Sequence, residues 1–263
     1  MFNMLRMDLR RLAKCRSFYV ILAVNAVLLL LVTIMASSIA NPEMLDAMEA
    51  QGAEITRSDR MLSELLESMS QLELMHETLG GGFLLVIAGI GMTTFVNGDF
   101  SSGFIKNTCC AKSRRWDYVC AKILLAGIYS GFLTVFSVLL MLFAPVLVHW
   151  QPVPAPVWSI VQYTFWLWLP HWAFSLMALA LVLLTRSSTL GIILSMVAGS
   201  GLTAMLAGTL CSMLGLPHVE QYFLNTVVSG VNAPQVGLIL ACTLVWGLIY
   251  GVGSLLCMEK RDI

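Results

Sequence analysis

The sequence predicts an all-α, polytopic membrane protein with six transmembrane helices, an amphipathic interfacial helix at the N-terminus and a helical extracellular loop. Of the 263 residues, 58% are hydrophobic and only 11% are charged, whereas a soluble domain carries roughly a quarter charged residues. Long apolar runs recur along the chain, and none of them contains Asp, Glu, Lys or Arg. Runs of about 20 such residues are long enough to cross a hydrocarbon core of about 30 Å.

The chain is expected to form one membrane domain over residues 1–263. Its predicted interfacial segment is 1–17, its extracellular loop is 40–79 and its cytosolic loop is 97–122. The six predicted spans are residues 18–39, 80–96, 123–148, 158–184, 190–214 and 236–258.

The distribution of basic residues predicts the orientation of these spans. Thirteen of the fifteen Lys and Arg residues lie in the N-terminal segment, the 97–122 loop, the connection after the fourth span and the C-terminus. Only Arg57 and Arg60 lie in the other connections. Because cytoplasmic segments carry the excess of Lys and Arg, we expect both termini on the cytoplasmic side of a bacterial cytoplasmic membrane.

The N-terminal segment has the pattern of an amphipathic helix. Its apolar residues at helical spacing are Phe2, Leu5, Leu9 and Leu12, and its basic residues are Arg6, Arg10, Arg11 and Lys14. Such a helix lies in the membrane interface and is attracted by anionic lipid. The alternative is a cytosolic extension of the first span.

The extracellular loop is acidic, with nine carboxylates between Glu43 and Glu77. Asn41-Pro42 begins a first helix, because Asn is a preferred cap and Pro is tolerated in the first turn. A second helix is expected from Ser58 to Leu79. One interpretation is a lid that packs on the bundle, and the other is a surface that gates substrate or binds a partner.

Few residues in this chain suit catalysis or metal binding. The four histidines are scattered and the chain has no P-loop, so we expect no metal site, no bound cofactor and no enzymatic activity of its own. A possible substrate path in the fourth span comprises Trp166, Trp168 and His171. The alternative is a core helix that Pro170 kinks and in which His171 bonds a neighbour.

The loop at 97–122 reads NGDFSSGFIKNTCCAKSRRWDYVCAK and holds five of the basic residues. Topology alone explains why they lie inside. Attraction to lipid is a second explanation. Nucleic-acid binding is not expected, because no folded domain lies beside this loop. Docking onto a cytosolic protein is the third.

The same loop resembles that of type-2 ABC exporter permeases, in which an acid precedes Gly-Thr-x-Lys and a later Ser-Arg starts the third span. The matching residues are Asp99 for the acid, Gly103, Lys106, Ser113, Arg114 and a following Lys122, whereas Phe104 replaces the Thr. The motif covers about fifty residues. The six spans and the amphipathic N-terminal helix extend the similarity in architecture over the whole chain. Permeases of peptide-antibiotic immunity or bacitracin resistance have a similar size and outer loop.

The resemblance implies a permease subunit without catalysis that exports a substrate. ATP and Mg would be bound by a separate ABC ATPase, and a second permease chain, identical or different, would complete the transporter. The residues implied to couple to the ATPase are Asp99, Gly103, Phe104, Ile105, Lys106, Ser113, Arg114 and Arg115. The alternatives are a secondary carrier or channel, and a non-transporting membrane subunit whose outer loop binds a partner.

Overall fold

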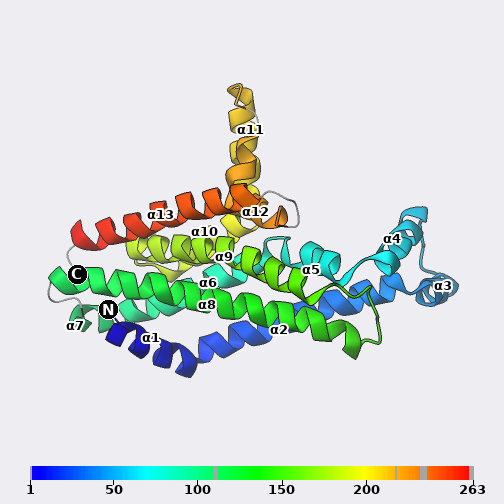
Figure 1. Cartoon of the computed structure of the whole chain (residues 1–263), viewed down its shortest axis with the longest axis horizontal. Helices are drawn as coiled ribbons and strands as arrows, with labels where there is room; N and C mark the ends of the chain where they lie inside the picture. Colours follow the sequence, from blue (N-terminus) through cyan, green and yellow to red (C-terminus); the bar gives the residue numbers. More distant parts are fainter. Residues whose placement is uncertain (1, 109–111, 217, 232–235, 261–263) are drawn as a thin grey trace.

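The computed structural model describes residues 2–108, 112–216, 218–231 and 236–260, and of residues 107, 108, 112–114 and 260 only the backbone. This part of the chain is helical and contains no β-strand. Its helices form one elongated bundle (Figure 1). The long helices are α2 (Arg16–Ala40), α6 (Phe83–Ser101), α8 (Lys112–Leu147), α9 (Val157–Thr185) and α13 (Val236–Lys260).

Five helices are long and apolar enough to cross a membrane, and the number is six if a bent pair counts as one span. The bent pair is α10 (Ser188–Gly199) and α11 (Leu202–Met213), which meet at 61°. These helices indicate a multi-pass membrane protein. The predicted span at 190–214 corresponds to this pair, and the chain turns sharply at its middle.

Helix α9 lies at the centre of the bundle. It packs against α6, α8, α10 and α13, and its buried residues lie all round its circumference, as expected of an apolar helix without a polar face. By contrast, few residues of α2 and α13 are buried within their apolar stretches. The bundle therefore has one buried central helix and two peripheral helices whose apolar side chains face outward.

Small residues bring α6 and α10 close together. A side chain added at Gly89 of α6 would meet Ser195 at 2.7 Å and Phe174 at 2.9 Å. A side chain at Gly191 of α10 would meet Thr93 at 2.7 Å. Close approach of helix backbones at such small residues is typical of membrane helices.

The glycines of α8 have a different use. Gly127 and Gly131 contact the indole rings of Trp172 and Trp168. The centres of these two rings lie 5.7 Å apart, and their planes differ by 4°. The Trp168 indole N–H donates to the Gly127 carbonyl at 2.9 Å and the Trp172 indole N–H to the Ile123 carbonyl at 3.1 Å. Bulky rings, rather than a second backbone, therefore fill the small-residue face of α8.

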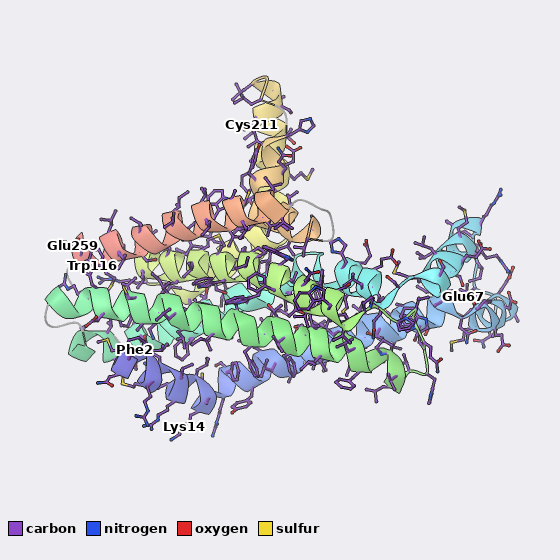
Figure 2. All side chains as sticks on the ribbon, in the orientation of Figure 1. Phe2, Lys14, Glu67, Trp116, Cys211 and Glu259 are labelled. Atoms are coloured by element: carbon purple, nitrogen blue, oxygen red, sulfur yellow. The ribbon has the colours of Figure 1, made fainter. Side chains whose placement is uncertain are left out.

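The break between α10 and α11 falls at Gly199 to Gly201, where Gly201 has a φ of +83°. The freed Gly199 carbonyl accepts a hydrogen bond from the Asn225 amide at 2.5 Å. Asn225 lies in α12 (Leu224–Ser229), which follows the short 3₁₀ helix η1 (Val219–Tyr222). Helix α11 projects away from the bundle, and Cys211 lies on its projecting part (Figures 1 and 2).

The N-terminal helix α1 (Phe2–Lys14) is followed by a bend at Cys15 that leads into α2 (Figure 1). It packs on α8. Its buried residues are Asp8 and Leu12, whereas Phe2 is exposed. The amphipathic helix exists with nearly the expected bounds, but its buried face includes an acid.

The predicted loop at 40–79 contains three helices: α3 (Pro42–Ala50), α4 (Arg57–Ser68) and α5 (Gln71–Leu79). The prediction of a single helix from Ser58 to Leu79 is wrong, because the backbone is extended at Met69 and a new helix begins after its cap residue Ser70. The Ser70 side chain and Glu73 form a capping box. The Gln71 backbone N–H donates to the Val153 carbonyl at 2.8 Å, which fixes the extended residues against the α8–α9 connection.

The predicted cytosolic loop at 97–122 is also mostly helical. Helix α6 continues to Ser101, α7 spans Phe104–Thr108 and α8 begins at Lys112. Gly103, with a φ of +68°, separates α6 from α7. Helices α6 and α8 thus extend beyond the predicted spans 80–96 and 123–148. Their added turns contain charged residues and lie at the end of the bundle where α1 and α7 lie (Figure 1).

Candidate functional site

Four charged side chains meet inside the protein at the α7 end of the bundle. Asp8 and Arg11 come from α1, Asp99 from the last turn of α6 and Lys122 from α8. Asp99 and Lys122 have no exposed surface, and Asp8 is 2% exposed. We refer to these four residues as the ion-pair cluster.

The cluster joins three helices through short contacts. Lys122 Nζ lies 2.7 Å from Asp99 Oδ2 and 2.9 Å from Asp8 Oδ2. A guanidinium nitrogen of Arg11 lies 2.7 Å from Asp99 Oδ1, and the other lies 3.6 Å from Asp8 Oδ1. Two carboxylates therefore face two cations, and each helix contributes a charge that another helix neutralises.

Aromatic rings surround the cations. The Lys122 ammonium lies 4.7 Å from the centre of the Phe95 ring, and the Arg11 guanidinium lies 4.4 Å from that of Phe104. The Tyr118 hydroxyl donates to Asp99 Oδ2 at 2.8 Å. These rings attract the cations through their π faces. The pairs that Lys122 forms with Asp8 and Asp99 are buried and therefore weakly screened, whereas the Arg11 side chain is 32% exposed.

Burial makes the cluster sensitive to the loss of any one charge. Removal of one partner from a buried ion pair typically costs about 3–5 kcal/mol, because the other charge stays buried and unpaired. Burial raises the pKa of the Asp8 carboxyl, and the positive charge of Lys122 opposes this effect. The attraction to Lys122 thus offsets part of the cost of keeping Asp8 ionised.

Helical spacing explains how the side chains reach one site. Asp8 and Arg11 are three residues apart on α1, and Tyr118 and Lys122 are four residues apart on α8. Residues at these spacings lie on one face of a helix. Each pair therefore points from its helix toward Asp99 at the end of α6.

Helix α7 is attached to this site by its two apolar residues. Ile105 is 3% exposed and belongs to the buried core. Phe104 lies under the Arg11 guanidinium. Lys106 is exposed on the same short helix. Phe104 and Ile105 thus anchor α7 to its own chain, which leaves Lys106 on the accessible side.

Other predicted coupling residues lie elsewhere at this end. An Arg115 guanidinium nitrogen donates to the carbonyls of Met258 and Glu259 at 3.3 and 3.5 Å, so it ties the start of α8 to the end of α13. Figure 2 shows Trp116 and Glu259 at this same end. The side chains of Ser113 and Arg114 lie outside the described residues.

The basic residues of α1 fall into two groups. Arg6, Arg10 and Lys14 are exposed, as expected of a helix that faces lipid headgroups or solvent. Arg11 instead turns inward to Asp99. The predicted interfacial set therefore includes one residue that the structure places in the ion-pair cluster.

The predicted substrate-path residues are divided between the interior and a groove. His171 has no exposed surface, and its Nδ1 lies 2.6 Å from the Leu167 carbonyl, one turn earlier in α9. Trp166 packs partly buried against the core. Trp168 lines an apolar groove of about 760 Å³ between α8 and α9. The core interpretation of His171 therefore agrees with the structure, whereas Trp168 is accessible from the groove.

Asp8, Tyr118 and Phe95 belong to the site but were not predicted from the sequence. A signal for Asp8 was present, because it interrupts the apolar face of the N-terminal helix between Leu5 and Leu12. Lys122 matched the family motif, but nothing in the sequence showed its partners. The pairing depends on the packing of three helices, which local patterns do not contain.

Within the described residues, no group of three or more His, Cys, Asp and Glu side chains is arranged to hold a metal ion. Comparison with known protein families and with curated proteins finds no match. The cluster itself consists of paired charges, and its geometry suits the mechanical joining of α1, α6, α7 and α8.

Proposed function

We propose that this chain is the transmembrane permease subunit of an ATP-binding-cassette exporter in a bacterial cytoplasmic membrane, with both termini in the cytoplasm. ATP and Mg are bound and ATP is hydrolysed by a separate ABC ATPase, and this chain catalyses no reaction. The observation that carries the proposal is the ion-pair cluster, which joins three helices beside the short helix α7. The motif at residues 99–122 supports it.

A force applied to α7 has a direct route into the bundle. Ile105 is buried among the core residues, and Phe104 contacts Arg11. Arg11 is paired with Asp99, and Asp99 with Lys122. Because an opened buried ion pair costs several kcal/mol, these helices move together rather than separate. This behaviour is required of an element that converts ATPase motion into rigid-body movement of spans.

A second permease chain, identical or different, completes the transporter in this proposal. The peripheral helices α2 and α13 leave apolar faces for lipid or for such a chain. An apolar groove of about 330 Å³ between α8, α9 and α13 includes Gly247 and Gly251, where a further helix can approach closely. Substrate passage is assigned to the α8–α9 groove beside Trp168, and not to the buried His171.

Co-purification tests the partnership with an ATPase. The full chain is purified from its native membranes in mild detergent, and bound proteins are identified by mass spectrometry. We expect a P-loop ATPase to be retained by the wild type. Lys106→Glu, on the exposed side of α7, should reduce the retained ATPase at least about tenfold. In this proposal Lys106 faces a carboxylate of the ATPase, and the like-charge contact that the substitution creates costs several kcal/mol.

Glu77→Lys is the matched control, since Glu77 is also exposed but lies in α5, away from α7. It should retain the ATPase as the wild type does. Absence of any ATPase from a folded wild-type preparation contradicts the proposal. Substrate movement down a gradient without nucleotide would instead support a secondary carrier or channel.

A further inference from the structure

The α3–α4 hairpin, residues 42–68, projects from the bundle at the end opposite to α7 (Figure 1). Glu67 lies on its α4 arm (Figure 2). Arg60 of α4 holds the two arms together, because its guanidinium lies 2.6 Å from Glu49 Oε2 and 3.2 Å from Asp46 Oδ1. The hairpin is thus a defined structure with helices on both arms.

The α4 arm leaves most of its apolar stripe uncovered. It packs against α2, and its most buried residue is the polar Ser63, at 4% exposure. The apolar stripe of α4 lies on the neighbouring face and consists of Met61, Leu62 and Leu65. Their exposed fractions are 64%, 41% and 57%. An amphipathic helix normally packs with its apolar face inward, so this face is available to another molecule.

The α3 arm shows the same feature. Leu45 is buried at 5% exposure, whereas Met44 and Met48 are 50% and 47% exposed. Methionine is flexible and polarizable, and it is frequent on surfaces that accept varied apolar partners. Both arms therefore present apolar side chains outside the bundle.

The charge of the hairpin excludes several occupants of this surface. Residues 42–68 hold seven carboxylates and two arginines, so the hairpin does not enter the hydrocarbon core. An anionic lipid surface repels it, because such surfaces attract basic segments. A second copy of the same hairpin repels it as well, since like charges at an interface cost several kcal/mol.

We infer that the α3–α4 hairpin is a docking surface for a cationic amphipathic peptide or helix. The apolar face of the ligand covers Met61, Leu62 and Leu65, in the manner of a helix laid on an apolar groove. Its Lys and Arg side chains lie near the exposed carboxylates of Glu64 and Glu67. Binding here requires neither an ATPase nor transport, so it is independent of the proposed permease function.

Fluorescence anisotropy tests this surface on the full chain in phosphatidylcholine nanodiscs. The probe is a labelled amphipathic helix of Lys and Leu, and the signal from empty nanodiscs is subtracted. A Glu/Leu helix of the same pattern and a Lys/Leu peptide of scrambled order are the comparison ligands. We expect only the amphipathic Lys/Leu helix to bind, and salt should weaken it because exposed charges are screened.

Two exposed substitutions separate the apolar and ionic contributions. Leu65→Ser and Glu64→Lys should each weaken binding by about tenfold. The first removes apolar contact with the ligand, and the second replaces attraction to the cationic ligand by repulsion. Glu77→Lys, on α5, should bind as the wild type does. Because Leu65 and Glu64 are exposed, the thermal unfolding midpoint should not change in either variant.

Equal binding of the scrambled or the Glu/Leu ligand overturns the inference, and so does equal weakening by Glu77→Lys. If the wild type binds no probe, and the Leu65→Ser variant differs from it in oligomeric state, the stripe contacts a second copy of the chain. That result also overturns the inference. None of these outcomes bears on ATPase co-purification, so the two proposals fail separately.

Discussion

At the scale of single residues, the ion-pair cluster stabilises the structure only as a complete set of Asp8, Arg11, Asp99 and Lys122. Each is costly when buried alone, and each is neutralised by a charge from another helix. Asp99 and Arg11 were both singled out from the sequence, but for separate reasons: one in a coupling motif and the other in an interfacial helix. The structure shows that they touch.

Lys122→Met should lower the thermal unfolding midpoint strongly, because Asp8 and Asp99 would then share the single cation Arg11. We expect a loss of about 3–5 kcal/mol, the usual cost of breaking a buried pair. The midpoint is measured on detergent-solubilised protein. Adding Asp8→Asn should recover part of the loss, since it removes the excess carboxylate.

Lys14→Met is the control for this prediction, because Lys14 is exposed on α1. Surface substitutions away from special features usually change stability by about 0.5 kcal/mol or less. Equal midpoints for Lys122→Met and Lys14→Met would show that the ion-pair cluster does not stabilise the fold.

At the scale of elements, the apolar runs predicted most helices and their approximate positions, but not their breaks. The bend between α10 and α11 requires Asn225, which is distant in sequence, to satisfy the Gly199 carbonyl. The break between α4 and α5 requires the capping box of Ser70 and Glu73. The first break depends on a tertiary contact. The second is predictable from the Ser-x-x-Glu pattern at residues 70–73, but the apolar residues on both sides of it favoured one continuous helix.

Gly89→Ala tests the close packing of α6 on α10. The added methyl group would lie 2.7 Å from Ser195 and 2.9 Å from Phe174, so one element must shift. Overpacking of this kind typically costs about 1–3 kcal/mol. We expect a lower thermal unfolding midpoint in detergent.

Gly253→Ala provides the comparison, because a methyl group there meets nothing within 4 Å. Alanine is also the better helix former by about 1 kcal/mol, so this variant should be unchanged or more stable. A Gly89→Ala protein as stable as Gly253→Ala would contradict the packing described for α6 and α10.

At the scale of the whole molecule, basic residues gather toward the α7 end, whereas the α3–α4 hairpin is acidic. The helical class and this charge asymmetry followed from composition, which acts over whole segments. The projection of α11 and the exposed stripe of α4 did not, since a sequence pattern shows that a face is apolar but not what covers it.

The charge asymmetry predicts the sidedness of the protein in the membrane. In a cysteine-free background, Glu64→Cys should react with a membrane-impermeant maleimide in intact cells. Lys106→Cys should react only after the membrane is permeabilised, because the proposed orientation places the Lys- and Arg-rich end in the cytoplasm. Labelling of Lys106→Cys in intact cells would reverse the proposed orientation.

The central claim is that ATPase motion enters the bundle through α7 and the ion-pair cluster. Hydrogen–deuterium exchange of the purified permease–ATPase complex, with and without ATP, tests it most directly. We predict that ATP changes exchange in α1, at the end of α6 and in α7 of the wild type, and that Lys122→Met confines the change to α7. An identical response in wild type and Lys122→Met, with the ATPase bound in both, would contradict the claim.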